Sequence, residues 1–132
     1  MNIKYTLPVA STAFFNSPKF SIEGGRKCVL EASHEGDEFG NAKKLIIRFT
    51  NVEAFKCTYF LAIEHRMVNI AYDRLVDLGD SDWLRELTGN LRQNEADTPA
   101  LFHLAIFFDD GPLYDFICGG FDVGEEDLEW EL

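Results

Sequence analysis

The sequence has no hydrophobic run long enough to cross a membrane as a helix. Its longest apolar stretches, at residues 59–63 and 104–108, are far shorter than the about 20 residues that a membrane span requires. Pro8, Ser11 and Thr12 interrupt the apolar residues that follow the N-terminus, so we expect no secretory signal. These absences predict a soluble protein without a membrane partner, and we expect it to be cytoplasmic.

Cysteine is too sparse for a disulfide scaffold. The three residues, Cys28, Cys57 and Cys118, are odd in number and far apart, and none belongs to a C-x-x-C motif. A secreted disulfide framework has a denser and even set, and a zinc site needs closely spaced cysteine or histidine ligands. We therefore expect three buried free thiols in a reducing compartment and no metal site.

Motifs of the common catalytic and cofactor sites are also missing. The chain contains no G-x-S-x-G or H-E-x-x-H motif, no calcium-loop spacing and no glycine loop that opens a helix after a strand. The sequence thus predicts no catalytic, metal or cofactor-binding residue and favours a non-enzymatic protein. Because catalytic residues can converge from distant positions, one constellation stays open. His103, Asp115 and Cys118 lie on strands that we expect to pair, although such polar pairs are ordinary features of sheets.

Lysine and arginine are absent from the last 40 residues. Residues 1–92 carry 12 acids and 12 bases, so the whole formal net charge of −11 comes from the 11 acids of residues 93–132. Those acids are Glu95, Asp97, Asp109, Asp110, Asp115, Asp122, Glu125, Glu126, Asp127, Glu129 and Glu131. A chain without a basic surface is a poor ligand for nucleic acid, whereas its field attracts a basic protein.

The sequence does have ample material for a hydrophobic core. Hydrophobic residues make up 46% of the 132 residues and Phe occurs 12 times, which excludes a disordered chain. No repeat or Pro/Gly/Ser-rich linker divides the sequence. We therefore predict a single domain over residues 1–132.

Alternating side chains predict a series of strands. They cover residues 3–7, 20–23, 26–32, 44–52 and 55–64, and in residues 44–52 the side chains of Leu45, Ile47 and Phe49 share one face. Residues 66–78 fit either a helical stripe or a strand, and we favour a strand over 73–78. The apolar runs 100–108 and 113–118 predict a hairpin, because an Asp-Gly turn separates them.

One main helix is predicted over residues 81–92, with Asp80 or Ser81 as its cap and an apolar stripe that begins at Trp83. After Gly119 and Gly120, residues 127–132 alternate between acidic and apolar side chains and predict a last edge strand. The predicted fold class is α+β. We expect a curved, mainly antiparallel sheet of about six to eight strands with one main helix and a C-terminal hairpin.

Three segments resemble a pattern found in small bacterial proteins. They are Leu75–Leu84, which leads from a strand into a Ser-x-Trp helix, and the apolar segments Leu101–Asp110 and Tyr114–Cys118, with Asp at the turn between them. The resemblance covers the C-terminal half of the chain. Proteins of this size and style include the immunity proteins of bacterial toxin systems, which are often acidic because they block basic toxin surfaces. The resemblance implies a function of this kind and transfers no functional residue.

The leading hypothesis is a protein-binding module whose acidic C-terminal surface docks a basic partner, as an immunity protein does. The partner-binding candidates are Asp109, Asp110, Asp122, Glu125, Glu126, Asp127, Glu129, Trp130 and Glu131, with Trp130 as an aromatic anchor. A second hypothesis is a small enzyme or small-ligand binder with a pocket near His103 and Asp115. A third is a homodimer or other homo-oligomer that pairs through the C-terminal strand.

Overall fold

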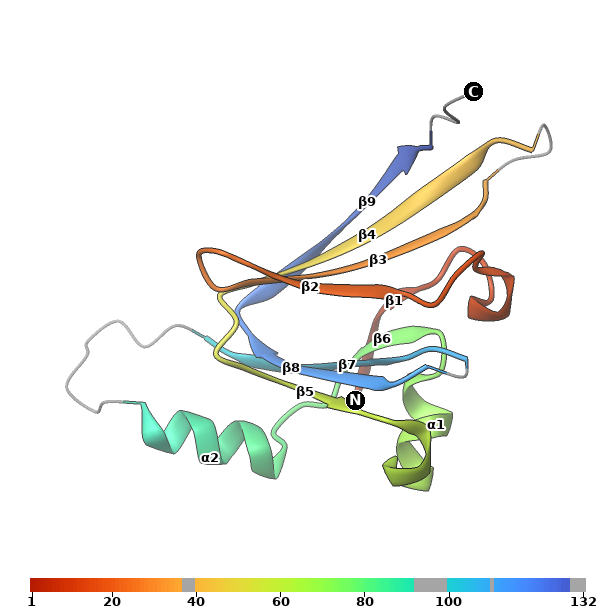
Figure 1. The fold of residues 1–132 in the computed structure, drawn as a ribbon. Helices are drawn as coiled ribbons and strands as arrows, with labels where there is room; N and C mark the ends of the chain where they lie inside the picture. Colours follow the sequence, from red (N-terminus) through yellow and green to blue (C-terminus); the bar gives the residue numbers. More distant parts are fainter. Residues whose placement is uncertain (37–39, 92–99, 110, 129–132) are drawn as a thin grey trace.

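The computed structural model describes residues 1–36, 40–91, 100–109 and 111–128 (Figure 1). The strands in these residues are β1 (Asn2–Thr6), β2 (Lys19–Glu23), β3 (Lys27–Glu35), β4 (Ala42–Thr50), β5 (Ala54–Thr58), β6 (Arg74–Asp77), β7 (Phe102–Phe107), β8 (Leu113–Cys118) and β9 (Gly120–Asp127). The helices are α1 (His65–Ala71), α2 (Asp82–Asn90) and the short 3₁₀ helices η1 (Ser11–Ala13) and η2 (Phe60–Ala62).

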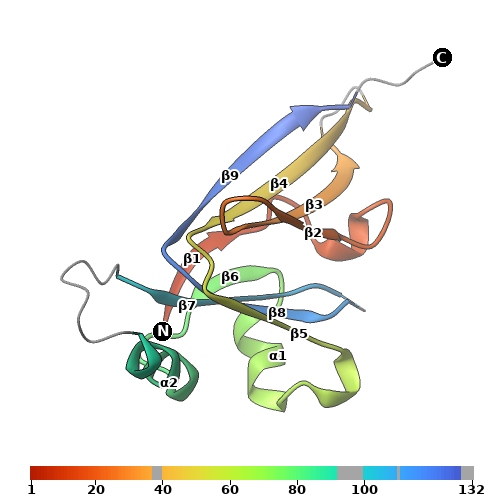
Figure 2. The same ribbon diagram turned by 60° about the vertical axis from the view of Figure 1, so that its left-hand side comes forward.

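The described strands form two antiparallel sheets rather than one. Sheet A has the order β1-β6-β7-β8-β5, and sheet B has the order β2-β3-β4-β9. Figure 2 shows sheet B lying over one face of sheet A, with α1 and α2 on the opposite face of sheet A. The α+β class is therefore correct, but the prediction of a single large sheet with one main helix is only partly correct.

The core lies between the two sheets and is built mainly from aromatic and branched side chains. Phe49 on β4 stacks on Phe116 on β8, with 3.8 Å between the ring centroids, and both side chains are fully buried. Leu45 and Ile47 share the inner face with Phe49, as their alternation predicted, while Arg48 faces outward. A strand with one face in this core must alternate apolar and polar residues, and β4 does so over most of its length.

The chain passes from sheet A to sheet B at Gly119. Strand β8 ends in sheet A at Cys118, and β9 begins at Gly120 and pairs with β4 of sheet B. The last described strand therefore runs over Gly120–Asp127, and most of the strand predicted over residues 127–132 lies outside the described residues. The two glycines do not end the strand region, and at Gly119 the backbone passes close to the side chain of Asn51.

The second α-helix, α1, covers the first part of residues 66–78, for which the sequence allowed either a helix or a strand. Met67 and Ala71 of α1 are buried against Val76 and Phe107 on the outer face of sheet A. The following residues form the short strand β6, as predicted for 73–78. Residues 55–64 were wrongly expected to be one strand, since β5 ends at Thr58 and the chain then turns through η2.

Helix α2 begins where its cap predicted. Ser81 is the N-cap residue, and its side-chain oxygen accepts a hydrogen bond from the backbone N–H of Leu84. Asp82 in the first turn complements the positive end of the helix dipole. The helix ends at Asn90, slightly earlier than predicted, and Figure 1 shows it on the side of sheet A that faces away from sheet B.

Candidate functional site

The acidic C-terminal residues lie beside bases of the same chain. Strand β9 is the antiparallel neighbour of β4, so Asp127 lies opposite Lys43, Glu126 opposite Lys44 and Asp122 opposite Arg48. Lys43 forms an ion pair with Asp127, and a guanidinium nitrogen of Arg48 lies 3.8 Å from Asp122. The charge that is segregated along the sequence is therefore partly neutralised by the strand pairing.

The remaining described candidates of the acidic surface also have partners in the chain. The Asp109 carboxylate lies outside sheet B and accepts a hydrogen bond of 3.1 Å from the hydroxyl of Tyr72. A carboxylate oxygen of Glu125 lies 4.0 Å from Nε2 of the buried His34. The candidates Asp110, Glu129, Trp130 and Glu131 lie outside the described residues.

The proposed cysteine–histidine–aspartate constellation does not form. In the β7–β8 hairpin Phe102 lies opposite Cys118, and Ala105 lies opposite Asp115. Since side chains alternate across a strand, His103 and Asp115 point to the outer face, whereas Cys118 points into the core between the sheets. The cysteine is therefore out of reach of the histidine, and burial raises the pKa of its thiol to about 11.

A serine takes the position that the cysteine was expected to hold. Nε2 of His103 lies 2.7 Å from Oδ1 of Asp115, and Nδ1 of His103 lies 2.7 Å from Oγ of Ser81. We call these three residues the relay. His103 and Asp115 are buried, and Ser81 is half-buried at the cap of α2. In the sequence Ser81 stands out only as a candidate helix cap, and nothing in its surroundings points to His103 as its partner.

Neighbouring side chains hold the relay from two sides. The ring of Trp83 contacts His103 edge-on, with centroids 5.2 Å apart and planes at 80°. The ammonium group of Lys56 lies over the Trp83 ring, 4.0 Å from its centroid. Lys56 on β5 is also the cross-strand neighbour of Asp115 on β8. A row of polar side chains thus crosses the outer face of sheet A and ends under the first turn of α2.

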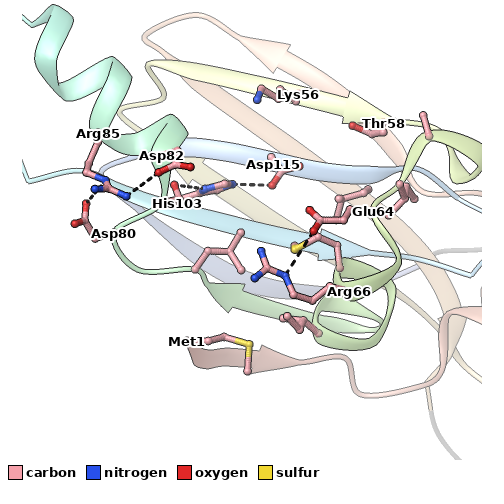
Figure 3. A pocket seen from close by; sticks show the side chains of 17 residues that line it. Met1, Lys56, Thr58, Glu64, Arg66, Asp80, Asp82, Arg85, His103 and Asp115 are labelled. Carbon is pink, nitrogen blue, oxygen red and sulfur yellow. Dashed lines mark hydrogen bonds and ion pairs between the residues drawn. The ribbon is translucent and has the colours of Figure 1, made fainter.

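The relay lies at the floor of a cavity of about 540 Å³ between α1, α2 and the outer face of sheet A (Figure 3). This volume falls within the usual range of small-molecule sites. The lining comprises Met1, Lys56, Thr58, Ala62, Ile63, Glu64, Arg66, Met67, Ile70, Leu78, Asp80, Ser81, Asp82, Arg85, His103, Leu113 and Asp115. The pocket that was hypothesised near His103 and Asp115 therefore has a counterpart in the structure.

The charges around the cavity are arranged in two groups and one separate cation. Arg85 on α2 lies 2.7 Å from Asp82 and 3.6 Å from Asp80, and Arg66 on α1 lies 3.9 Å from Glu64. Figure 3 shows these groups on opposite sides of the relay. Lys56 contacts Trp83, and no carboxylate in the described part of the chain makes an ion pair with it. A ligand would therefore meet both signs of charge.

One side of the cavity has an exposed apolar rim. Ala62 at the end of η2 and Ile63 directly after it line the cavity. In the same turn the side chains of Tyr59 and Leu61 are 74% and 99% exposed. The ring of Phe60 stacks at 6.2 Å on Phe107 and fixes the turn to sheet A. The cavity therefore opens beside an exposed apolar surface.

The described residues offer little support for a metal site. They contain no group of three histidine, cysteine, aspartate or glutamate side chains placed to hold a metal ion.

Cys28 and Cys118 are buried and Cys57 is exposed, and all three are free thiols, so the expectation of burial is wrong for Cys57. No helix among the described residues is long and apolar enough to span a bilayer.

The comparisons with known proteins add no relative. No protein-family model matches the chain. No curated protein sequence and no solved structure matches it significantly. The relay and its cavity therefore have to be interpreted from their own geometry.

Proposed function

We propose that the protein binds a small polar ligand in the cavity between α1 and α2. The observation that carries this proposal is the buried Ser81–His103–Asp115 relay at the floor of a cavity of about 540 Å³. Small-molecule sites combine a mostly apolar lining with a few well-placed polar groups. This cavity is more polar than such a site usually is: Met67, Ile70 and Leu113 supply apolar walls beside the relay, and charged and polar side chains make up the larger share of the lining.

The polar groups of the cavity suit a ligand that carries hydrogen-bonding atoms. Lys56 is held by Trp83 rather than by a carboxylate, so its charge is available to an anionic or polar group. His103 and Asp115 are held in one orientation by their mutual hydrogen bond. Polar groups that are already oriented bind a ligand without a further ordering cost, which favours a specific site.

Fragment binding followed by NMR tests this proposal. We would titrate isotopically labelled protein with small carboxylic esters, carboxylic acids and amides and follow the amide signals. Binding fragments are expected to shift the signals of Thr58 on β5, Leu78 after β6 and His103 on β7, which all line the cavity. Ala62→Trp places a large side chain at the cavity and is expected to abolish these shifts.

Ala13→Trp is the matched control, because Ala13 is exposed on η1 and does not line the cavity. This variant is expected to bind the fragments like the unchanged protein. The proposal is contradicted if the fragments shift no cavity signal, or if Ala62→Trp and Ala13→Trp bind them equally well.

A second candidate function is the binding of a basic protein partner by the acidic strand β9, as in an immunity protein. The observation that favours it is the exposure of Asp122, Glu125, Glu126 and Asp127 on a strand at the edge of sheet B. Exposed ion pairs contribute only about 0 to 1 kcal/mol each, so a partner's bases can replace those of β4. The same acids would face each other if β9 paired with a second copy, which disfavours a homodimer through this strand.

Affinity capture at low and high salt tests this second candidate. Reversal of the four β9 acids to Lys is expected to abolish retention of a basic protein that the unchanged protein retains at low salt. Ala62→Trp leaves β9 intact and is expected to retain the same protein. Equal retention by the reversed and unchanged proteins would rule out β9 as the binding surface.

A further inference from the structure

We infer that Ser81 is the nucleophile of an acyl-transfer reaction in which a small carboxylic ester is hydrolysed in the cavity between α1 and α2. The inference rests on the proposed ligand-binding function and names the chemistry of the same site. It is carried by three side chains from three elements, the cap of α2, β7 and β8, which meet through two hydrogen bonds of 2.7 Å.

The proposed reaction requires an ionised Asp115 and a neutral His103, and the hydrogen bonds of the relay then place the remaining protons. An ionised carboxylate only accepts hydrogen bonds, so Asp115 accepts the proton on Nε2 of His103. The lone pair of the neutral imidazole then lies on Nδ1, which accepts the hydroxyl proton of Ser81. A base is therefore in contact with the serine proton, and a third group orients the base, as nucleophilic catalysis requires.

The oxygen of Ser81 keeps a lone pair for attack. A hydroxyl oxygen has two lone pairs, and one of them accepts the backbone N–H of Leu84 at 3.1 Å. The hydroxyl proton is directed to His103, so the second lone pair has no partner within the relay. Ser81 also contributes to the cavity lining, where a bound carbonyl group can approach it.

The first turn of α2 supplies donors for the charge that develops on the carbonyl oxygen. Two backbone N–H groups of this turn are already used, because that of Leu84 donates to the Ser81 hydroxyl and that of Arg85 donates to the Ser81 carbonyl. Helix geometry leaves the N–H groups of Asp82 and Trp83 without an intrahelical acceptor at the same end. Backbone N–H groups at a helix N-terminus stabilise an oxyanion.

The reaction balances with the ester and water alone. Ser81 Oγ bonds to the carbonyl carbon as its proton passes to His103 Nδ1, and the ester C–O bond breaks as the alcohol oxygen takes that proton. The acyl group remains on Ser81. A water molecule then gives a proton to Nδ1 and attacks the acyl carbon, and Ser81 Oγ leaves with that proton as the carboxylic acid departs.

The cavity suits a small ester with an apolar part. Its volume of about 540 Å³ accommodates a molecule of modest size. Ile70 and Leu78 line the cavity with Met67 and offer apolar contacts to an acyl or alkyl chain. We therefore name small carboxylic esters as the substrate class.

The relay has a second conceivable role, which the experiment must separate from catalysis. The same hydrogen bonds attach the N-terminus of α2 to sheet A, and loss of a cap destabilises a helix by about 1 kcal/mol. Ser81→Ala removes both the nucleophile and the cap, whereas Ser81→Asn removes the nucleophile but keeps a good capping side chain. Ser17→Ala changes an exposed serine and is the matched control.

The experiment uses p-nitrophenyl acetate as the ester and an alkyl fluorophosphonate as the covalent probe. The unchanged protein and Ser17→Ala are expected to hydrolyse the ester and to carry the probe on the peptide that contains Ser81. Ser81→Ala and Ser81→Asn are expected to lose at least about a hundredfold in kcat and to remain unlabelled. Asp115 is a positioning residue, so Asp115→Asn is expected to lower kcat while KM is kept.

Two different failures are distinguishable. If the ester shifts the NMR signals of the cavity but Ser81→Asn hydrolyses it as fast as the unchanged protein and no probe is bound, the nucleophile is wrong and ligand binding stands. If neither the ester nor the other fragments shift a cavity signal, both the reaction and the proposed function are wrong.

Discussion

Lys43 on β4 lies directly opposite Asp127 on β9, and the two side chains form an ion pair across the strands. Arg48 and Asp122 form a longer contact of 3.8 Å farther along the same pair of strands. Bases from residues 1–92, where acids and bases are equal in number, thus lie beside acids from residues 93–132, which contain no Lys or Arg. The strand register converts a charge asymmetry along the chain into a set of cross-strand pairs.

Reversing the β9 acids is expected to weaken the fold as well as the surface charge. Asp122→Lys and Asp127→Lys together would place like charges opposite Arg48 and Lys43. Like charges directly opposite each other in a sheet are destabilising, and for these exposed positions we expect a loss of about 1 kcal/mol in total. Urea unfolding at low salt measures the loss, and 1 M salt is expected to remove most of it.

Glu86→Lys is the control for this charge change, since Glu86 is exposed on α2 and away from β4. Its urea midpoint is expected to stay close to that of the unchanged protein at both salt concentrations. Glu86→Lys changes the net charge by half as much as the double β9 variant, so a loss for Glu86→Lys of about half that of the β9 variant would show that net charge and not strand pairing is responsible.

The aromatic pair between the sheets is expected to dominate the stability of the core. Phe49→Ala or Phe116→Ala should lower the free energy of unfolding by about 3 to 5 kcal/mol, because each removes a fully buried ring and leaves a cavity. Phe15→Ala, at a half-exposed position, should cost less than about 1 kcal/mol. Urea unfolding of the three variants checks the order, and a comparable loss for Phe15→Ala would contradict it.

The local pattern of strands was predictable, but their division into two sheets was not. Apolar and polar side chains alternate in β4 because one face of the strand meets the core, and Leu45, Ile47 and Phe49 are the apolar residues of that face. The pairing partner of β4 is β9, which lies far along the chain, so this pairing is not a local property of the β4 sequence. Periodicity carries no information about such a partner, and so one sheet and two sheets give the same pattern.

The candidate site was predictable in part for the same reason. His103 and Asp115 belong to one hairpin, so their proximity followed from local sequence. The face on which Cys118 lies depends on the exact register, and a shift by one residue would reverse it. Ser81 reaches His103 only because the loop after β6 places α2 over the hairpin. The sequence shows a capping serine followed by Trp83, and this pattern predicts the start of a helix but not the contact with His103.

Alkaline pH is expected to destabilise the protein through buried thiols. Burial raises the pKa of Cys118 to about 11 from an ordinary value of 9.0. The folded state therefore holds this proton more tightly than the unfolded state, so the stabilisation is complete below pH 9 and is lost as the pH rises to 11. The free energy of unfolding should fall by up to about 2 kcal/mol across this range.

Cys118→Ala isolates the contribution of this thiol. The variant lacks the group that titrates, so its free energy of unfolding should fall less steeply between pH 9 and pH 11 than that of the unchanged protein. Tyr114, whose pKa burial raises to about 12, contributes in the same direction to both proteins. Urea unfolding at several pH values measures the two slopes, and parallel slopes would show that Cys118 contributes nothing.

The crossing between the sheets is expected to tolerate a methyl group at one glycine and not at its neighbour. A Cβ atom at Gly119 would lie 3.0 Å from Cβ and 3.1 Å from Nδ2 of Asn51, whereas one at Gly120 would meet only Thr50 Oγ1 at 3.6 Å. Gly119→Ala should therefore lower the free energy of unfolding by about 1 to 3 kcal/mol, as overpacked sites do. Gly120→Ala should change it by less than about 0.5 kcal/mol.

Removal of the opposing side chain should rescue the tight position. Asn51 has a φ of 50°, a conformation that glycine adopts freely, so Asn51→Gly removes the clashing atoms without straining the backbone. In the Asn51→Gly background, Gly119→Ala should therefore cost markedly less than in the unchanged protein. A double-mutant cycle measured by urea unfolding gives the coupling between the two positions. A coupling near zero would mean that the crossing is not limited by the contact between Gly119 and Asn51.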